Sequence, residues 1–288
     1  MRSCLIFLML IAAVFLGATI LGSVPEAVRA ADKMSVDEIV SKHLESIGTA
    51  SARGAAGGRV VGGTSQVTFR SSGITQSEGG AVLASDGPKS MVTMKFPSSQ
   101  YPYEKIGFDG KKVTAYQLPG AMYSSLGSFA RANPEMLKEG LIGGTLSSAW
   151  PFLDLSDKKA KLESVGTKKV DSRQMIEIRY IPRGGSDLKI SLFFDAENFH
   201  HVRTVYEKVI SAQMGRSVDQ SARMNETRYR LVEEFSDFKT EGAMTLPHTY
   251  KIHFEQQGAG TQISDWVMTL VKFDFNKHLG IGDFDVSG

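Results

Sequence analysis

Four histidines are the residues whose chemistry first suggests a metal site. His200 and His201 are adjacent, and His248 and His253 are an odd number of positions apart. Side chains alternate between the two faces of a strand, so neither pair could hold one ion from a single strand. His201 and His253 could share an ion only on paired strands, and no cysteine or cluster of carboxylates accompanies them. We therefore expect no metal and no other cofactor, and we expect these histidines at the surface or rim of the fold.

Serine, histidine and acidic residues are plentiful, but they form no catalytic motif. The chain contains no GxSxG sequence, and the adjacent acids Glu233 and Glu234 would alternate across a strand. The glycine-rich stretch 49–63 contains neither GxxxxGK[ST] nor GxGxxG, which favours a flexible connection into a kinked strand over a phosphate-binding loop. These patterns indicate a protein that is not an enzyme, and a hydrolase remains the weakest hypothesis.

Apolar and aromatic residues at strand and helix positions are the remaining candidates for a binding site. Such residues most often form the core, but a single curved sheet with few helices has more apolar surface than those helices can cover. Burial of each ligand methylene is worth about 0.8 kcal/mol, so an acyl chain needs no specific polar partner. The candidate cavity residues are Phe96, Tyr116, Trp150, Phe152, Tyr180, Leu192, Phe194, Tyr206 and Phe254.

Three runs of alternating apolar residues between Gln174 and Ile210 predict the centre of the fold. Pro182-Arg183-Gly184-Gly185 separates the first run from the second, and Asp195-Ala196-Glu197-Asn198 separates the second from the third. Connections this short join antiparallel neighbours. The stretch therefore predicts a three-stranded meander with one apolar face.

Further short strands are predicted on both sides of this meander, with hairpin turns at Asp86-Gly87 and Asp109-Gly110. A capping box at Ser35 to Glu38 opens one amphipathic helix, which ends at Gly48. The final strand, Ile263 to Phe275, is apolar at successive positions, so we expect it to be central and covered on both faces.

Between Ala121 and Asp154 the apolar residues no longer alternate as in a strand, and in part of the segment they recur at helical spacing. Two short helices, separated by Asn133-Pro134, and an apolar stretch containing Trp150 are predicted here. We call this segment the insert and interpret it as a helical flap over the sheet. The predicted fold class is α+β, mainly β: about ten or eleven strands in one strongly curved antiparallel sheet, with a leading helix and the insert covering it.

The N-terminal 30 residues have the pattern of a secretory signal peptide. An apolar run from Cys4 to Val24 follows Arg2, and Val28-Arg29-Ala30 provides small residues for cleavage. A periplasmic or secreted protein is expected, with an uncleaved N-terminal membrane anchor as the alternative. Residues 31–288 are predicted to form a single domain. A formal net charge of +2 gives no reason to expect nucleic acid as a partner.

Several segments form a recognisable series: the helix opening Asp37-Glu38-Ile39-Val40, the strands Ile176–Tyr180 and Leu188–Asp195 with the turn into Val202-Arg203, the stretch Glu241–Ile252 with Leu246-Pro247, and the ending Gly282–Val286. Together with the signal peptide, they resemble the LolA-like proteins, which are periplasmic lipoprotein carriers and outer-membrane lipoprotein-sorting relatives. The resemblance implies an open half-barrel wrapped around helices, with a hollow that takes acyl chains. It transfers no individual carrier residue.

These features lead to two hypotheses from different classes. The first is a non-enzymatic exported carrier of lipid, lipoprotein acyl chains or another apolar ligand, which would enter between the sheet and the insert. The second is a cell-envelope scaffold or sensor that binds a protein partner at a free edge of the sheet. Lipid or a lipidated protein is the partner expected under the first hypothesis, and an envelope protein under the second.

Overall fold

The structure is a computed structural model, which describes residues 34–71, 73–211 and 226–287. The predicted signal peptide lies outside the described residues, and so does almost all of the polar connection expected at 211–224.

One antiparallel sheet of 12 strands forms the frame of the molecule. Its strands are β1 (Arg59–Arg70), β2 (Ile74–Asp86), β3 (Lys89–Lys95), β4 (Tyr103–Phe108), β5 (Val113–Ala115), β6 (Lys161–Val170), β7 (Arg173–Ile181), β8 (Lys189–Asp195), β9 (His201–Ile210), β10 (Thr227–Glu241), β11 (Met244–Gln257) and β12 (Thr261–Phe275). The predicted meander corresponds to β7, β8 and β9, which pair antiparallel in sequence order.

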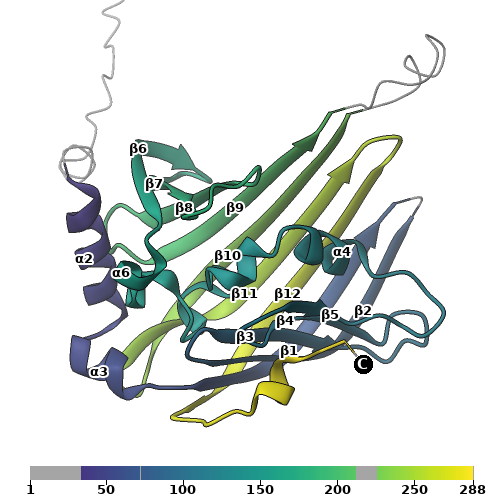
Figure 1. Cartoon of the computed structure of the whole chain (residues 1–288), viewed down its shortest axis with the longest axis horizontal. Helices are drawn as coiled ribbons and strands as arrows, with labels where there is room; N and C mark the ends of the chain where they lie inside the picture. The colour runs from purple at the N-terminus through teal and green to yellow at the C-terminus, as the bar shows by residue number, and fades with distance from the viewer. Residues whose placement is uncertain (1–33, 72, 212–225, 288) are drawn as a thin grey trace, which may run out of the picture.

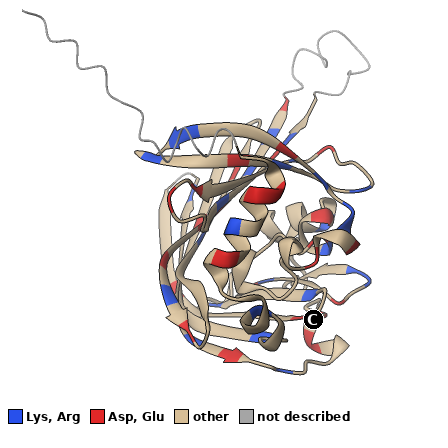
Figure 2. Cartoon of the chain, turned by 90° about the vertical axis from the view of Figure 1, so that its left-hand side faces the viewer, with Lys and Arg blue, Asp and Glu red and all other residues tan. Residues whose placement is uncertain are grey.

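The strand order is β5-β4-β3-β2-β1-β12-β11-β10-β9-β8-β7-β6, so two meanders are joined where β1 pairs with β12. Among the described strands β5 and β6 are the edges and do not pair, so the sheet stays open. Figure 2 shows it curving around α2 and the insert. The predicted open half-barrel is confirmed, with slightly more strands than expected.

The helices of the described residues lie before the sheet, in the insert, directly after the insert (α6) and near the C-terminus (η3). They are α2 (Val36–Ile47), α3 (Ala50–Ala55), α4 (Ser125–Ala132), α5 (Glu135–Lys138) and α6 (Leu155–Lys158), with the 3₁₀ turns η1 (Gly144–Leu146), η2 (Pro151–Leu153) and η3 (Ile281–Phe284). The capping box at Ser35 and Glu38 is present. Within the described ranges, no helix has the length and hydropathy needed to cross a membrane.

The glycine-rich stretch 49–63 is more ordered than its sequence predicts. Thr49 accepts a hydrogen bond from the Ala52 amide and caps α3, a helix that the interpretation as a flexible connection missed. The expected kink is confirmed, because the register of β1 against β12 shifts between Gly62 and Gly63.

This bulge gives a matched pair of glycine substitutions. A Cβ at residue 63 would collide with the carbonyl oxygen of Thr269, whereas at residue 62 the nearest atom is 3.9 Å away. We expect Gly63→Ala to lower the free energy of unfolding by about 2–3 kcal/mol, because the backbone of β12 must move. Gly62→Ala should stay within about 1 kcal/mol of the parent in urea unfolding. Equal losses in the two variants would contradict the observed register.

The two faces of the sheet differ sharply, and the expectation for the last strand was wrong in one respect. β12 is central, as predicted, and Trp266, Met268 and Leu270 on its inner face are buried. Val271 on its outer face is 73% exposed. Val271 therefore reflects strand propensity at a position where the outer face of β12 meets solvent, and no helix of the described residues covers it.

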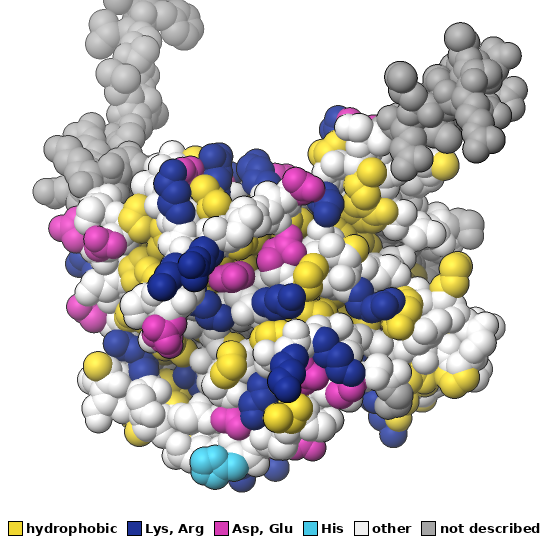
Figure 3. Space-filling model, viewed as in Figure 1, with side chains coloured by type: hydrophobic (Ala, Val, Ile, Leu, Met, Phe, Trp, Pro, Cys, Tyr) yellow, Lys and Arg dark blue, Asp and Glu magenta, His cyan; other side chains and the backbone are white. Residues whose placement is uncertain are grey.

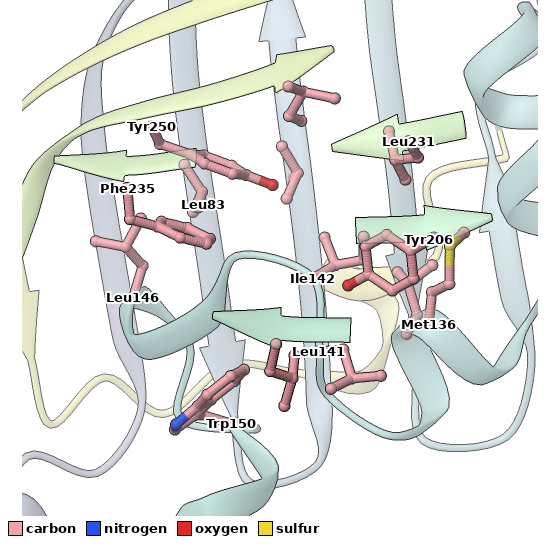
Figure 4. Packing of buried hydrophobic residues seen from close by; sticks show 14 of the residues in the cluster. Leu83, Met136, Leu141, Ile142, Leu146, Trp150, Tyr206, Leu231, Phe235 and Tyr250 are labelled. Carbon is pink, nitrogen blue, oxygen red and sulfur yellow. The ribbon is translucent and has the colours of Figure 1, made fainter. Parts of the chain in front are cut away.

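The insert fills the concave side of the sheet instead of lying over it as a loose flap. Figure 1 shows α4 in front of the central strands, while α2 stands at the left-hand edge. Met136, Leu137, Leu141 and Leu146 of the insert are each at most 1% exposed. In the close view of Figure 4, insert side chains interleave with Leu83, Leu231 and other residues of the strands. The insert is therefore a large part of the core.

Candidate ligand-binding site

Eight of the nine predicted cavity residues lie in one buried cluster. Phe96, Trp150, Phe152, Tyr180, Leu192, Phe194, Tyr206 and Phe254 are each at most 3% exposed and belong to the main core. Tyr116 is half-buried and packs beside Tyr103 and Lys105, apart from that cluster. Within the cluster Phe152 stacks on Phe194, with ring centroids 5.7 Å apart. Trp150 also packs on Phe152, so an incoming ligand would have to separate these three rings.

An open pocket of about 400 Å³ lies where the insert meets the far ends of β9, β10 and β11. This volume falls within the range of small-molecule sites. We call it the rim pocket; it is lined by Met122, Tyr123, Ser125, Ser128, Phe129, Ala132, Asn133, Lys208, Ile210, Tyr229 and Gln256. In Figure 3, yellow apolar side chains gather below the grey segment at the upper right, at the ends of these strands.

Exposed apolar side chains mark this rim. Met122 is 90% exposed and Ile210 at the end of β9 is about half exposed, and both line the rim pocket. Single exposed apolar residues are ordinary, but a group beside an apolar pocket is the usual sign of a binding surface.

The wall of the rim pocket continues into the core through a stack of aromatic rings. Phe129 of α4 stacks on Tyr229 of β10, with ring centroids 5.5 Å apart, and lies 5.3 Å from Phe254 of β11. Phe254 is one of the nine residues predicted from the sequence. The rim pocket therefore borders the predicted set at one residue, and α4 forms the boundary between them.

Two buried carboxylates fasten the insert to the sheet. Glu233 of β10 accepts hydrogen bonds from the hydroxyls of Tyr206 and Tyr250 and, at 2.8 Å, from the backbone amide of Gly143. Glu104 of β4 accepts from Ser124, the N-cap of α4, and from Tyr101. Burial raises the pKa of Glu233 and of Glu104 to about 7, although their donors favour the charged form.

A third fastening joins the insert to α2. The indole N–H of Trp150 donates to Nε2 of His43 over 3.0 Å. An indole can only donate, so His43 is protonated at Nδ1, which donates to the carbonyl oxygen of Phe199 at 2.9 Å. Burial lowers the pKa of His43 to about 3, so the ring stays neutral.

Arg59, at the start of β1, provides a fourth fastening. Its guanidinium donates to the carbonyl oxygens of Thr145 at 2.7 Å and Ser147 at 3.4 Å, in and just after η1 of the insert. Four polar contacts, from β1, β4, β10 and α2, thus hold the insert in place along its length.

The positions of the histidines differ in part from the expectation. His201 is fully buried, stacked on Trp150 with ring centroids 4.5 Å apart, and His248 is also buried, so neither is a surface residue. His201 lies on the inner face, while His253 lies on the outer face bonded to Asp265. The pairing of these two residues on one ion is therefore excluded, and β9 and β11 are not neighbours in the sheet. Within the described residues, no three metal-binding side chains gather.

Sequence reasoning missed Glu104, Glu233 and Arg59, although the pattern contained a signal. Glu233 alternates with Leu231 and Phe235, so it occupies an inner position of its strand. A charged residue in such a position must find partners inside the fold, since an unpaired buried charge is very costly. The insert supplies one of those partners, the amide of Gly143, and a local sequence pattern does not predict which distant segment will provide it.

Comparisons with known proteins find similarity only among solved structures. No family model and no curated protein matches the chain. A LolA superfamily protein from Nitrosomonas europaea is 12% identical, with 87% of this chain and 97% of that chain covered and a TM-score of 0.46. A DUF1329 family protein from Desulfovibrio piger is 9% identical, with 87% and 97% covered and a TM-score of 0.40.

An outer-membrane lipoprotein-sorting protein domain from Vibrio parahaemolyticus is 11% identical, with 85% of this chain and 97% of that chain covered and a TM-score of 0.34. These structures include a LolA superfamily protein and a lipoprotein-sorting domain, the kinds of protein that the sequence resembles. Because each of these TM-scores is below 0.5, no conclusion about this chain rests on them, and its function is inferred from its own residues.

Proposed function

We propose that this chain is an exported, non-enzymatic binding protein for an apolar ligand such as a lipid or the acyl chains of a lipidated protein. The observation that carries the proposal is the rim pocket, which is open, partly apolar and continuous with the aromatic core through Phe129. Its export rests on the sequence of residues 1–30. Apolar surface gives affinity without specific polar partners, which suits acyl chains of varied length.

In this proposal the rim pocket receives the ligand first, and displacement of α4 admits it further. The eight buried residues of the predicted set would then line the opened space. The four polar fastenings hold the closed arrangement, so the balance between closed and open forms depends on them as well as on apolar packing. A closed core gives the empty protein a stable resting state.

Pairing of a partner strand at a sheet edge, the second hypothesis, is less well supported. The edge strand β6 carries Lys161, Lys168 and Lys169 and has a register shift between Ser164 and Gly166. Lysines and bulges are the features by which natural edges resist strand addition. The opposite edge, β5, has only three residues, and the C-terminal segment bonds to it through Val286 and Thr114.

Charge placed in the rim pocket should abolish binding of an apolar probe. Ala132 lines this pocket and is exposed, so Ala132→Glu adds a carboxylate without disturbing the core. We expect binding of dansyl-labelled undecanoic acid, followed by fluorescence, to weaken at least tenfold, because a carboxylate must be desolvated when the apolar ligand enters.

Thr64→Glu, on the exposed outer face of β1, is the matched control and should bind the probe like the parent. Equal probe binding by Ala132→Glu and the parent would contradict the proposed site. Native mass spectrometry of protein purified from an envelope fraction gives a second test. Bound lipid is the expected result, and retention of a single protein without lipid would favour the scaffold or sensor hypothesis.

A further inference from the structure

A second pocket lies at the other end of the insert, next to α3, and its lining is basic and glycine-rich. We call it the base pocket; it measures about 440 Å³ and is lined by Ala50, Arg53, Gly54, Gly57, Gly58, Arg59, Asp86, Gly87, Ser148 and Leu153. Figure 1 shows α3 at the bottom left, far from α4. The base pocket is therefore separate from the rim pocket, and a ligand bound there would not occupy the proposed apolar site.

Arg59 is a buried cation that lacks an anion. The residue is 2% exposed, its Nε atom has no hydrogen-bond partner, and no carboxylate among the described residues pairs with it. Its two acceptors are neutral carbonyl oxygens. Burial lowers the pKa of Arg59 to about 10, which reflects the cost of keeping this charge out of water. An anion nearby would offset that cost.

Arg53 adds a second positive charge to the same wall. Its guanidinium donates to the carbonyl oxygens of Leu44 and Gly48, which orients it without neutralising it. The one acid in the lining, Asp86, is already engaged by Lys89 at 3.1 Å and by the backbone amide of Leu279. Two arginines therefore line this space, and the single carboxylate there has its own cationic partner.

Glycines leave the space between these charges open. A Cβ at Gly54 or at Gly87 would meet no atom within 4 Å, so both walls are bare. Gly58 has a different reason for being glycine, since a Cβ there would collide with the carbonyl oxygen of Lys277. Ser148, whose hydroxyl donates to the carbonyl oxygen of Gly87, adds a small polar group to the lining.

We propose that the base pocket binds a phosphate-type anion between Arg53 and Arg59. Guanidinium groups bind phosphate oxygens through planar, paired hydrogen bonds and keep their charge at every physiological pH. Inorganic phosphate and a phospholipid headgroup present the same chemistry to these two residues. The tests therefore include both.

Isothermal titration of the chain with inorganic phosphate is the direct test. Gly54→Glu places a carboxylate in the lining at a position where a side chain has room, and Arg53→Gln removes one charge. Phosphate binding should be at least tenfold weaker in both variants than in the parent. Gly54→Ala is the control and should bind phosphate like the parent. Gly54 lies in α3, and alanine has a higher helix propensity than glycine, so we expect Gly54→Ala to fold like the parent.

Water-soluble dihexanoyl phosphatidic acid, titrated in parallel, separates the two sources of the anion. Binding at least tenfold tighter than that of phosphate, and lost in Gly54→Glu, would identify a lipid headgroup as the ligand. Equal or weaker binding would identify the free ion. Absence of measurable heat with either compound at about 20 mM, roughly twentyfold above a dissociation constant of about 1 mM, would overturn the proposal. Unchanged binding in Gly54→Glu would overturn it too.

Discussion

Replacing Trp150 by alanine should destabilise the protein by about 4–5 kcal/mol, the largest effect expected of a single substitution in the insert. Trp150 is 1% exposed and packs on Phe152 and His201. Truncation of a buried tryptophan leaves a cavity and typically costs about 3–5 kcal/mol. It would also leave Nε2 of His43 without its donor, which adds to the loss.

Urea unfolding followed by fluorescence measures this loss directly, since Trp266, the other of the chain's two tryptophans, remains as a reporter in β12. Trp150→Phe is the matched variant. It keeps an aromatic ring and removes the indole N–H, so its loss should be about half as large. A loss below about 1.5 kcal/mol for Trp150→Ala, far under the usual cost of such a truncation, would show that the insert is not part of the cooperative core.

Replacing Glu233 by glutamine should change how stability depends on pH. The folded pKa of Glu233 is raised from 4.5 to about 7, so the folded state holds a proton that the unfolded state releases between these values. The free energy of unfolding therefore falls as pH rises from 4.5 through about 7, and it levels off above that value. The shift corresponds to about 3 kcal/mol for this fully buried group.

The buried histidine His43 affects the pH dependence of stability in the opposite direction. The pKa of His43 is lowered to about 3, so the unfolded chain takes up a proton below pH 6.5 that the folded state refuses. This contribution reduces stability on acidification and is common to the parent and the variant. The informative quantity is therefore the difference in unfolding free energy between the parent and Glu233→Gln at each pH.

We expect the parent to lose about 3 kcal/mol relative to Glu233→Gln between about pH 5 and pH 8. Denaturant unfolding at several pH values measures this difference. Exposed Glu197→Gln controls for the change in net charge and should follow the parent at every pH. Parallel curves for the parent and Glu233→Gln would contradict the burial of this carboxyl under the insert.

The same carboxylate links stability to the proposed binding function. Ionised Glu233 is paired with Gly143 of the insert and two tyrosine hydroxyls, so movement of the insert removes one of its three donors. Loss of a donor to a buried charge costs more than loss of a neutral hydrogen bond. Displacement of the insert is accordingly opposed by polar contacts in addition to the apolar packing around Leu141 and Leu146.

Much of the sheet could be predicted because strand signals are local. Alternation in β7, β8 and β9 follows from side chains pointing to opposite faces, and the turns at Gly87 and Gly110 lie where Asp-Gly pairs predicted them, each with positive φ. Residues with local partners were also predicted well, as in the capping box at Ser35. The helix α3 was missed because the glycine-rich and alanine-rich stretch that contains it is equally typical of a loop.

The candidate site was predicted only in part, for a physical reason. Burial of the aromatic set followed from composition and period, but whether those rings line a space or fill one depends on how deeply the insert seats. That depth is decided by partners distant in sequence, such as Glu233 with Gly143 and Arg59 with Thr145. The rim pocket arises where α4 ends short of the strand tips, which no sequence period encodes.

The amino-acid sequence by itself determined the strands, their turns, the leading helix and the apolar face of the sheet, because each depends on residues within a few positions of one another. Only the tertiary structure decided that the insert completes the core, that His201 and Glu233 are buried, and where the two pockets open. These features depend on contacts between segments far apart in the chain. Such contacts form, and stabilise the protein, only when the curved sheet brings those segments together.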